Sequence, residues 1–149
     1  MYIMTYGFYL ATELVRVVQM SGFILKESAA GDTEISSYEF EELPFEIGPG
    51  HFKGLGGTVI GEATRLMMLR IEAGSDLPLH RATPGFAVIL SGVVQVSGNH
   101  GDSVEMRTGD LMRIETKARG PWRISNSSDS DVFIALVVMP TLGVDPSNA

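Results

Sequence analysis

The sequence predicts an all-β protein whose short strands form a sandwich or a barrel. From about Thr58 onward, short stretches rich in Val, Ile, Leu, Met and Phe alternate with turn sequences such as Gly-Ser-Asp, Asn-His-Gly-Asp and Asn-Ser-Ser-Asp. Branched and aromatic residues favour strands, whereas Gly, Asn, Asp and Ser favour the turns between them. The 149 residues, with 44% hydrophobic residues and 17 glycines, fit one turn-rich globular domain.

Residues 1–45 have a less regular pattern, and we predict that they form an irregular N-terminal extension that packs on the barrel or on a partner. Residues 11–20 could be a helix with its apolar side chains on one side, or a strand that continues into residues 22–25. Short apolar runs do not distinguish these two structures. The stretch 27–37 is polar and is predicted to be a loop.

Residues 46–140 are predicted to form the barrel, and residues 141–149 form a tail with no apolar run. The clearest unit is a hairpin over residues 93–109, whose turn contains the glycines that a tight reversal needs. His100 lies at the tip of this turn and is expected to be exposed and inert. The other predicted strands lie within residues 63–74, 85–92, 111–115, 121–126 and 131–140.

Composition disfavours several classes of function. Eleven basic and 18 acidic residues give a net charge of −7, which opposes binding to nucleic acids and to anionic membrane surfaces. The absence of cysteine excludes disulfides, zinc-thiolate sites and a cysteine nucleophile. No Lys or Arg precedes Arg16, and Glu13 and Arg16 interrupt the apolar N-terminal stretch, so we expect neither a signal peptide nor a membrane span. We therefore expect a cytoplasmic protein that binds neither nucleic acid nor membrane.

Two segments bounded by glycines carry the most specific pattern in the chain. In the first segment, Gly74 is followed after five residues by His80, and Gly92 closes the segment. In the second, Gly109 opens a segment that Asn126 closes. These residues and their spacing resemble the two sequence motifs of the cupin superfamily.

The resemblance to the cupin superfamily covers Leu66 to Pro140, a little over half of the chain. Small cupins are jelly-roll barrels, commonly homodimers, with a small-molecule site inside the mouth of the barrel. The resemblance therefore implies a cupin-type jelly-roll β-barrel, a small-molecule ligand and a homodimer.

Metal-bearing cupins hold a divalent transition-metal ion with three histidines and one glutamate, and most of these ligands are missing here. The second His position of the first motif holds Ala82, the His position of the second motif holds Trp122, and no carboxylate occurs from Arg81 to Ser91. A single imidazole forms no chelate, so we expect no metal and no other cofactor. The alternative is a metal bound through ligands outside the motifs, such as His51 or Glu62.

The same replacements predict an apolar, aromatic-lined interior. If His80 points into the barrel, the period-two alternation of a strand places Ala82 there as well, and Trp122 shares the interior with Ile124. Together with Phe86, these side chains would suit a hydrophobic or planar ligand, because burial of apolar area is worth about 25 cal/mol per Å² and a Trp face adds stacking. The alternative is an interior filled completely by side chains.

Charged residues near the expected mouth of the barrel are further candidates for ligand binding. Arg65 and Arg70 flank the strand that would run beside the first motif, and whichever points inward could bind a carboxylate, phosphate or enolate oxygen. Their spacing of five places them on opposite faces of a regular strand. His51 and Glu62 could reach the mouth, whereas Arg81 is expected to face away from it.

His80 is the candidate catalytic residue, because an imidazole exchanges protons near neutral pH. Its alternative role is a hydrogen bond to a neighbouring strand. We favour a metal-independent isomerase, epimerase or cyclase that acts on a hydrophobic or aromatic small molecule in the barrel. The alternatives are a non-catalytic binding or sensor cupin, and a metal-dependent oxygenase or lyase with atypical ligands.

Overall fold

The computed structural model describes residues 3–10, 13–40, 60–115, 118 and 120–144. These residues form eleven β-strands and no helix, which confirms the predicted all-β fold. The strands are β1 (Ile3–Leu10), β2 (Glu13–Glu27), β3 (Thr33–Phe40), β4 (Arg65–Ile71), β5 (Asp76–Leu79), β6 (Gly85–Ser91), β7 (Val93–Ser97), β8 (Ser103–Arg107), β9 (Leu111–Ile114), β10 (Trp122–Ser125) and β11 (Val132–Val138).

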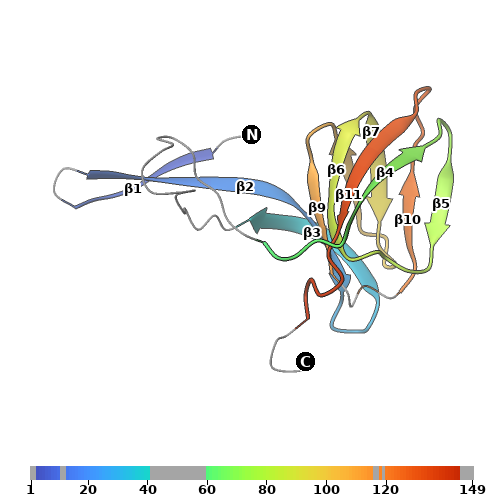
Figure 1. The fold of residues 1–149 in the computed structure, drawn as a ribbon, viewed down its shortest axis with the longest axis horizontal. Helices are drawn as coiled ribbons and strands as arrows, with labels where there is room; N and C mark the ends of the chain where they lie inside the picture. Colours follow the sequence, from blue (N-terminus) through green and yellow to red (C-terminus); the bar gives the residue numbers. More distant parts are fainter. Residues whose placement is uncertain (1–2, 11–12, 41–59, 116–117, 119, 145–149) are drawn as a thin grey trace. The chain divides into compact units, whose positions relative to one another are not determined.

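Hydrogen bonds join the strands into two sheets (Figure 1). The larger sheet has the order β1-β2-β9-β6-β11-β4, with β3 paired to β2, and the smaller sheet has the order β5-β10-β7-β8. Strands β6 and β4 both pair antiparallel to β11, whereas β2 and β9 run parallel. Most neighbouring strands are far apart in the sequence, as in the jelly roll that the resemblance implies.

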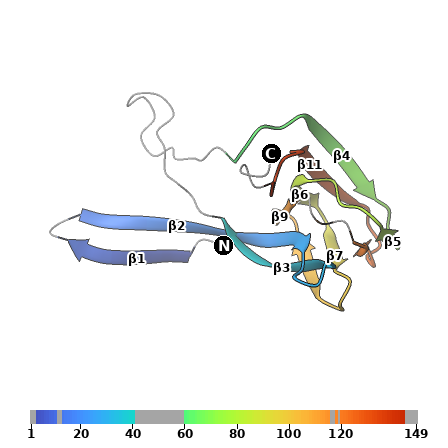
Figure 2. The same ribbon diagram turned by 90° about the horizontal axis from the view of Figure 1, so that it is seen from below.

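The chain divides into two compact units, Met1–Ser21 with Glu39–Ile60, and Gly22–Tyr38 with Gly61–Ala149. In the first unit, β1 pairs antiparallel with the N-terminal part of β2 (Figure 2). The stretch for which both a helix and a strand were considered is therefore a strand from Glu13 onward. The second, larger unit contains the C-terminal part of β2, a segment that lies within the predicted N-terminal extension. The predicted domain boundaries stay a prediction.

The predicted loop over residues 27–37 was wrong, because most of this stretch is strand. Strand β2 continues to Glu27 and β3 begins at Thr33, so that only a short turn separates them. In this turn the backbone N–H of Ser28 donates to the carbonyl of Asp32 at 2.6 Å. Burial explains the strand, since Thr33 and Ile35 are 0% and 4% exposed while Ser36 and Ser37 are exposed. Ile35 is the one buried apolar residue within 27–37, so the sequence shows no clear alternation of apolar and polar residues that would predict a strand there.

Buried side chains from both sheets form one hydrophobic core in the larger unit. Val94 and Val96 on β7, Met106 on β8, and Ile89 and Val132 from the larger sheet are at most 2% exposed. The side of the interior that β7 and β8 cover is thus filled by side chains. This agrees locally with the alternative of a filled barrel.

The glycines of the two motifs lie at turns that require left-handed backbone. Gly74, Gly92 and Gly109 have φ angles of 75°, 100° and 90°, and they follow β4, β6 and β8 respectively. At Gly92 a Cβ atom would also lie 2.6 Å from Cγ2 of the buried Val132. Glycine is the residue that adopts this conformation without steric cost, so these motif positions serve the strand connections.

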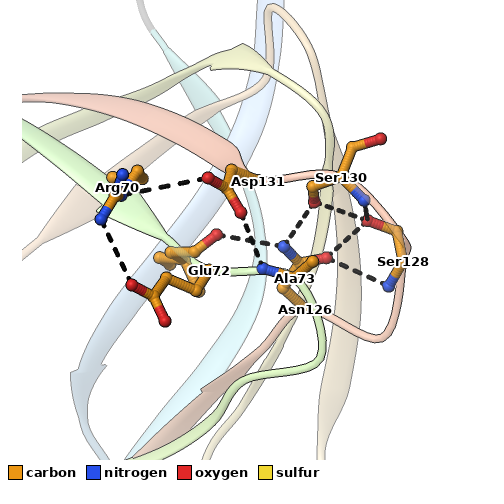
Figure 3. A network of polar contacts seen from close by, with 8 residues as sticks. Arg70, Glu72, Ala73, Asn126, Ser128, Ser130 and Asp131 are labelled. Atoms are coloured by element: carbon orange, nitrogen blue, oxygen red, sulfur yellow. Dashed lines mark hydrogen bonds and ion pairs between the residues drawn. The ribbon is translucent and has the colours of Figure 1, made fainter.

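Asn126, which closes the second motif, is fully buried and ties three chain segments together (Figure 3). Its Nδ2 donates to the carbonyls of Ile71 at 3.1 Å and Ser130 at 2.8 Å. Its Oδ1 accepts hydrogen bonds from the backbone N–H and the hydroxyl of Ser128. In addition, its backbone N–H donates to the carbonyl of Ser75. The side chain thus fixes the β10–β11 connection against the end of β4.

Among the described residues, no helix is long and apolar enough to cross a membrane. The cytoplasmic location stays a prediction.

Candidate functional site

A cavity of about 320 Å³ lies between the two sheets of the larger unit. Strands β4, β6, β9 and β11 line it from the larger sheet, and β5 and β10 line it from the smaller one. The lining is apolar except for Arg70, Arg81 and Thr83. The complete set is Met67, Leu69, Arg70, Ile71, Leu77, Leu79, Arg81, Thr83, Ala87, Met112, Ile114, Trp122, Ile124, Ile134 and Leu136.

The cavity and the filled core occupy different parts of the same interior. Neither β7 nor β8 contributes to the cavity, and their inward side chains Val94, Val96 and Met106 belong to the core. The lining strands present alternate residues, such as Ile134 and Leu136 on β11, as expected for strands with one face inward. The interior is therefore filled by side chains where β7 and β8 cover it, and it contains a cavity where the other strands line it.

Trp122 and Ile124 both line the cavity, as the sequence predicts. They lie two apart on β10, where they pair with Leu79 and Leu77 of β5. Trp122 is half-buried, and its Nε1 donates to the backbone carbonyl of Arg81 at 3.1 Å. This hydrogen bond satisfies the polar atom of the indole and leaves the ring as an aromatic wall of the cavity.

His80 does not line the cavity; it is exposed and directly follows β5. Leu77 and Leu79 of β5 line the cavity, whereas Pro78 between them and His80 beyond the end of the strand do not. The expected inward position of His80 is therefore not found. Arg81, expected to face away, lines the cavity instead.

Ala82 and Phe86 also lie elsewhere than expected. Ala82 is half-buried against the hydrophobic core but is not part of the cavity wall. Phe86 is buried, with 7% exposure, while its neighbour Ala87 lines the cavity. Adjacent residues of a strand point to opposite faces, so Phe86 packs on the outer side of β6. The cavity has one aromatic residue among its described lining, Trp122.

The charged candidates are all exposed where the structure describes them. Arg70 is among the lining residues, and its guanidinium lies 3.2 Å from Glu72 and 4.0 Å from Asp131 (Figure 3). Arg65, on the same strand, is exposed and is not part of the cavity lining, and neither is Glu62 in the segment before it. His51 lies outside the described residues.

The described lining does not fit the cupin metal ligand set of three histidines and one glutamate. It contains no His, Cys, Asp or Glu side chain. Throughout the described part of the chain, no group of three or more such side chains could hold a metal ion. A transition-metal ion prefers imidazole, thiolate or carboxylate ligands, and the wall residues that the structure describes offer none of them.

A second polar cluster joins the β2–β3 turn to the β7–β8 turn. Asp32 accepts hydrogen bonds from the Nδ2 of Asn99, at 3.0 Å, and from the Nε2 of His100. Asp102 accepts a hydrogen bond from the backbone N–H of Ile35 at 2.6 Å. Hydrogen bonds from Asn99 and His100 lower the pKa of Asp32 below its usual value, and desolvation opposes them only in part. His100 is exposed, as predicted, but it contacts Asp32.

Residues 76–129 match the family model described as the EutQ-like cupin domain. The matched range begins with β5, includes β10, and contains both the exposed His80 and the cavity residue Trp122. No curated protein matches the chain. The family match thus covers the two glycine-bounded motifs almost completely.

Proposed function

We propose that this chain, whose residues 76–129 match the EutQ-like cupin domain, binds a hydrophobic or aromatic small molecule in the cavity between its sheets, without a metal ion. The observation that carries this proposal is the apolar lining beside the half-buried Trp122. The cavity volume of about 320 Å³ lies at the small end of the range for ligand pockets. We therefore infer a ligand of modest size.

Apolar contact supplies most of the binding free energy in this proposal. Burial of apolar surface stabilises a complex by about 25 cal/mol per Å² before the costs of association are subtracted. The indole of Trp122 can stack on a planar ligand, and aromatic pairs contribute about 0.5–1.5 kcal/mol beyond area burial. Branched and long side chains such as Ile124, Ile134 and Leu136 complete the wall around it.

The lining favours binding over proton transfer. None of the described lining side chains is a His, Asp, Glu, Lys, Tyr or Cys, the usual general acids and bases. His80, the candidate for this role, is exposed outside the cavity lining. We therefore place a non-catalytic ligand-binding or sensor role first.

An isomerase, epimerase or cyclase is the second candidate, and Arg81 and Thr83 favour it. A guanidinium and a hydroxyl beside an apolar cavity can stabilise an enolate or orient a folded substrate without moving a proton themselves. Incubation of bound carbonyl compounds in D₂O separates the two candidates. Deuterium incorporation that depends on the protein would establish catalysis, whereas a ligand recovered unchanged would leave the binding role.

Filling the cavity tests the proposed binding site. Ala87 lies on the cavity wall, so Ala87→Leu should raise the dissociation constants of 1-octanol and 3-phenyl-1-propanol by about tenfold or more. Ala87→Val should have a smaller effect in the same direction. The emission of Trp122 reports binding, since it is the single tryptophan of the chain and lines the cavity.

Ala135→Leu is the matched control. Ala135 lies on β11 between the cavity residues Ile134 and Leu136, so its side chain faces outward and its substitution should leave binding unchanged. Dialysis against EDTA should also leave both dissociation constants unchanged. Equal binding by the Ala87→Leu and wild-type proteins, or loss of binding with EDTA, would contradict the proposal.

A further inference from the structure

We infer that the ligand is an apolar carboxylic acid whose carboxylate binds Arg81 at the rim of the cavity. This inference rests on the proposed function and specifies the chemical class of the ligand. Three observations carry it: the sign of the charges along the cavity, the absence of a partner for Arg81 among the described residues, and the fixed position of its backbone.

The charge on the cavity wall is opposite to the charge of the whole chain. The protein has 18 acidic and 11 basic residues, yet the charged residues of the described lining are two arginines and no carboxylate. An apolar cavity whose described lining has arginine but no carboxylate, in a chain of net charge −7, favours an anionic ligand over a cationic one.

The two arginines differ in their partners. Arg70 forms ion pairs with Glu72 and Asp131, which neutralise its charge. The guanidinium of Arg81 has no ion pair or hydrogen bond with any residue that the structure describes. Of the two lining arginines, Arg81 is therefore the one whose donors are available for a ligand. A guanidinium binds a carboxylate through two parallel hydrogen bonds, which adds both strength and orientation.

The backbone of Arg81 is held at the cavity wall. Its carbonyl accepts the hydrogen bond of Trp122 Nε1, and Leu79, two residues before it, pairs with Trp122 in the smaller sheet. Arg81 is itself exposed, so its cation stays hydrated at the rim while the apolar part of a ligand enters between the sheets.

Thr83 offers one further hydrogen-bond donor at the cavity wall. One guanidinium and one hydroxyl match the two oxygens of a carboxylate. A phosphate has more acceptor oxygens and a larger charge, and it would leave several acceptors without a protein donor. The lining thus favours a carboxylic acid over a phosphate ester.

Paired acids and alcohols of equal carbon skeleton test this inference. Octanoate and 3-phenylpropionate should bind at least about tenfold more tightly at neutral pH than 1-octanol and 3-phenyl-1-propanol, measured by Trp122 emission and by calorimetry. Arg81→Gln should remove this preference by weakening the acids about tenfold or more, with less than about a twofold change for the alcohols. Arg81→Lys, which retains the charge without the fork of donors, should weaken the acids to an intermediate extent.

Arg107→Gln is the charge-matched control, because Arg107 is exposed on β8, pairs with Glu105 and is not part of the cavity lining. Its substitution should leave the affinity for acids unchanged. Alcohols that bind as tightly as the acids, or acid binding that survives Arg81→Gln, would overturn the carboxylate inference and leave the proposed function intact. Failure of both acids and both alcohols to bind would overturn the proposed function itself.

Discussion

Asn126 is a residue of the second motif whose buried side chain contributes to the fold. Asn126→Ala would remove hydrogen bonds to the carbonyls of Ile71 and Ser130 and leave buried acceptors without partners. We expect the free energy of unfolding to fall by about 2–3 kcal/mol, measured by urea denaturation.

Asn99→Ala is the control for this substitution, because Asn99 is exposed and its Nδ2 donates to the partly exposed Asp32. It should lower the free energy of unfolding by less than about 1 kcal/mol. Equal losses for the two variants would show that burial of Asn126 is not the cause of its effect.

Single residues also show how far the sequence determined the candidate site. Trp122 and Ile124 were placed in the interior correctly, because the motif alignment and the alternation of β10 agree. Alternation fails to place a residue that lies beyond the end of a strand, and His80 and Ala82 lie beyond Leu79, the last residue of β5. The hydrogen bond from Trp122 to the carbonyl of Arg81 joins residues 41 positions apart, so no local pattern could reveal it.

At the scale of elements, the short strand β5 explains why part of the first motif was not predicted as a strand. This strand of four residues contains Pro78 and forms an edge of the smaller sheet, where proline is tolerated. The stretch did not appear among the predicted strands because proline interrupts the strand pattern. The other strands after residue 64 lie within predicted stretches, since none of them contains a proline and turn residues bound them.

The contact between the β2–β3 and β7–β8 turns predicts a dependence of stability on pH. Hydrogen bonds from Asn99 and His100 lower the pKa of Asp32, so its carboxylate is more strongly favoured in the folded state than in the unfolded state. This stabilisation is complete above the unfolded-state pKa of about 3.9 and is lost as the pH falls through the lower, folded-state pKa. Asp32→Asn should therefore reduce the loss of stability between about pH 5 and pH 2.5.

Urea denaturation at several pH values in this range checks the Asp32 prediction. Asp129→Asn is the control, because Asp129 is exposed and its side chain makes no hydrogen bond or ion pair with the described residues. It should keep the pH dependence of the wild type. An Asp32→Asn protein whose midpoint falls with pH as steeply as that of the wild type would contradict the proposed contribution of this contact.

At the scale of the whole molecule, composition and topology determine different properties. The alternation of short apolar runs and turns was enough to predict an all-β chain, and the two motifs were enough to predict the match of residues 76–129 to a cupin domain. The division of one interior into a filled part and a cavity depends on which strands face each other. Strands β4 and β10 lie in different sheets and are far apart in the sequence, so their joint contribution to the cavity follows only from the assembled fold.

The predicted homodimer can be tested on the outer face of the larger sheet. Leu66 and Met68 on β4 are 67% and 64% exposed, and Phe133 on β11 is 43% exposed. The β4–β11 register places Met68 beside Ala135 and Leu66 beside Val137, so these apolar side chains are continuous. Exposed apolar patches of this kind mark interaction surfaces, and a two-fold dimer would bury the same patch on both chains.

We expect the wild-type protein to have twice the mass of one chain in light scattering coupled to gel filtration. Met68→Glu would place two like charges in a desolvated two-fold interface, and it should therefore shift the protein toward the mass of one chain. Val144→Glu adds the same charge at an exposed residue after the last strand and should leave the dimer intact. Because Met68 faces away from the cavity, the Met68→Glu monomer should still bind the apolar probes. A wild-type monomer would refute the dimer, and loss of probe binding in a folded Met68→Glu monomer would show that the cavity depends on the second copy.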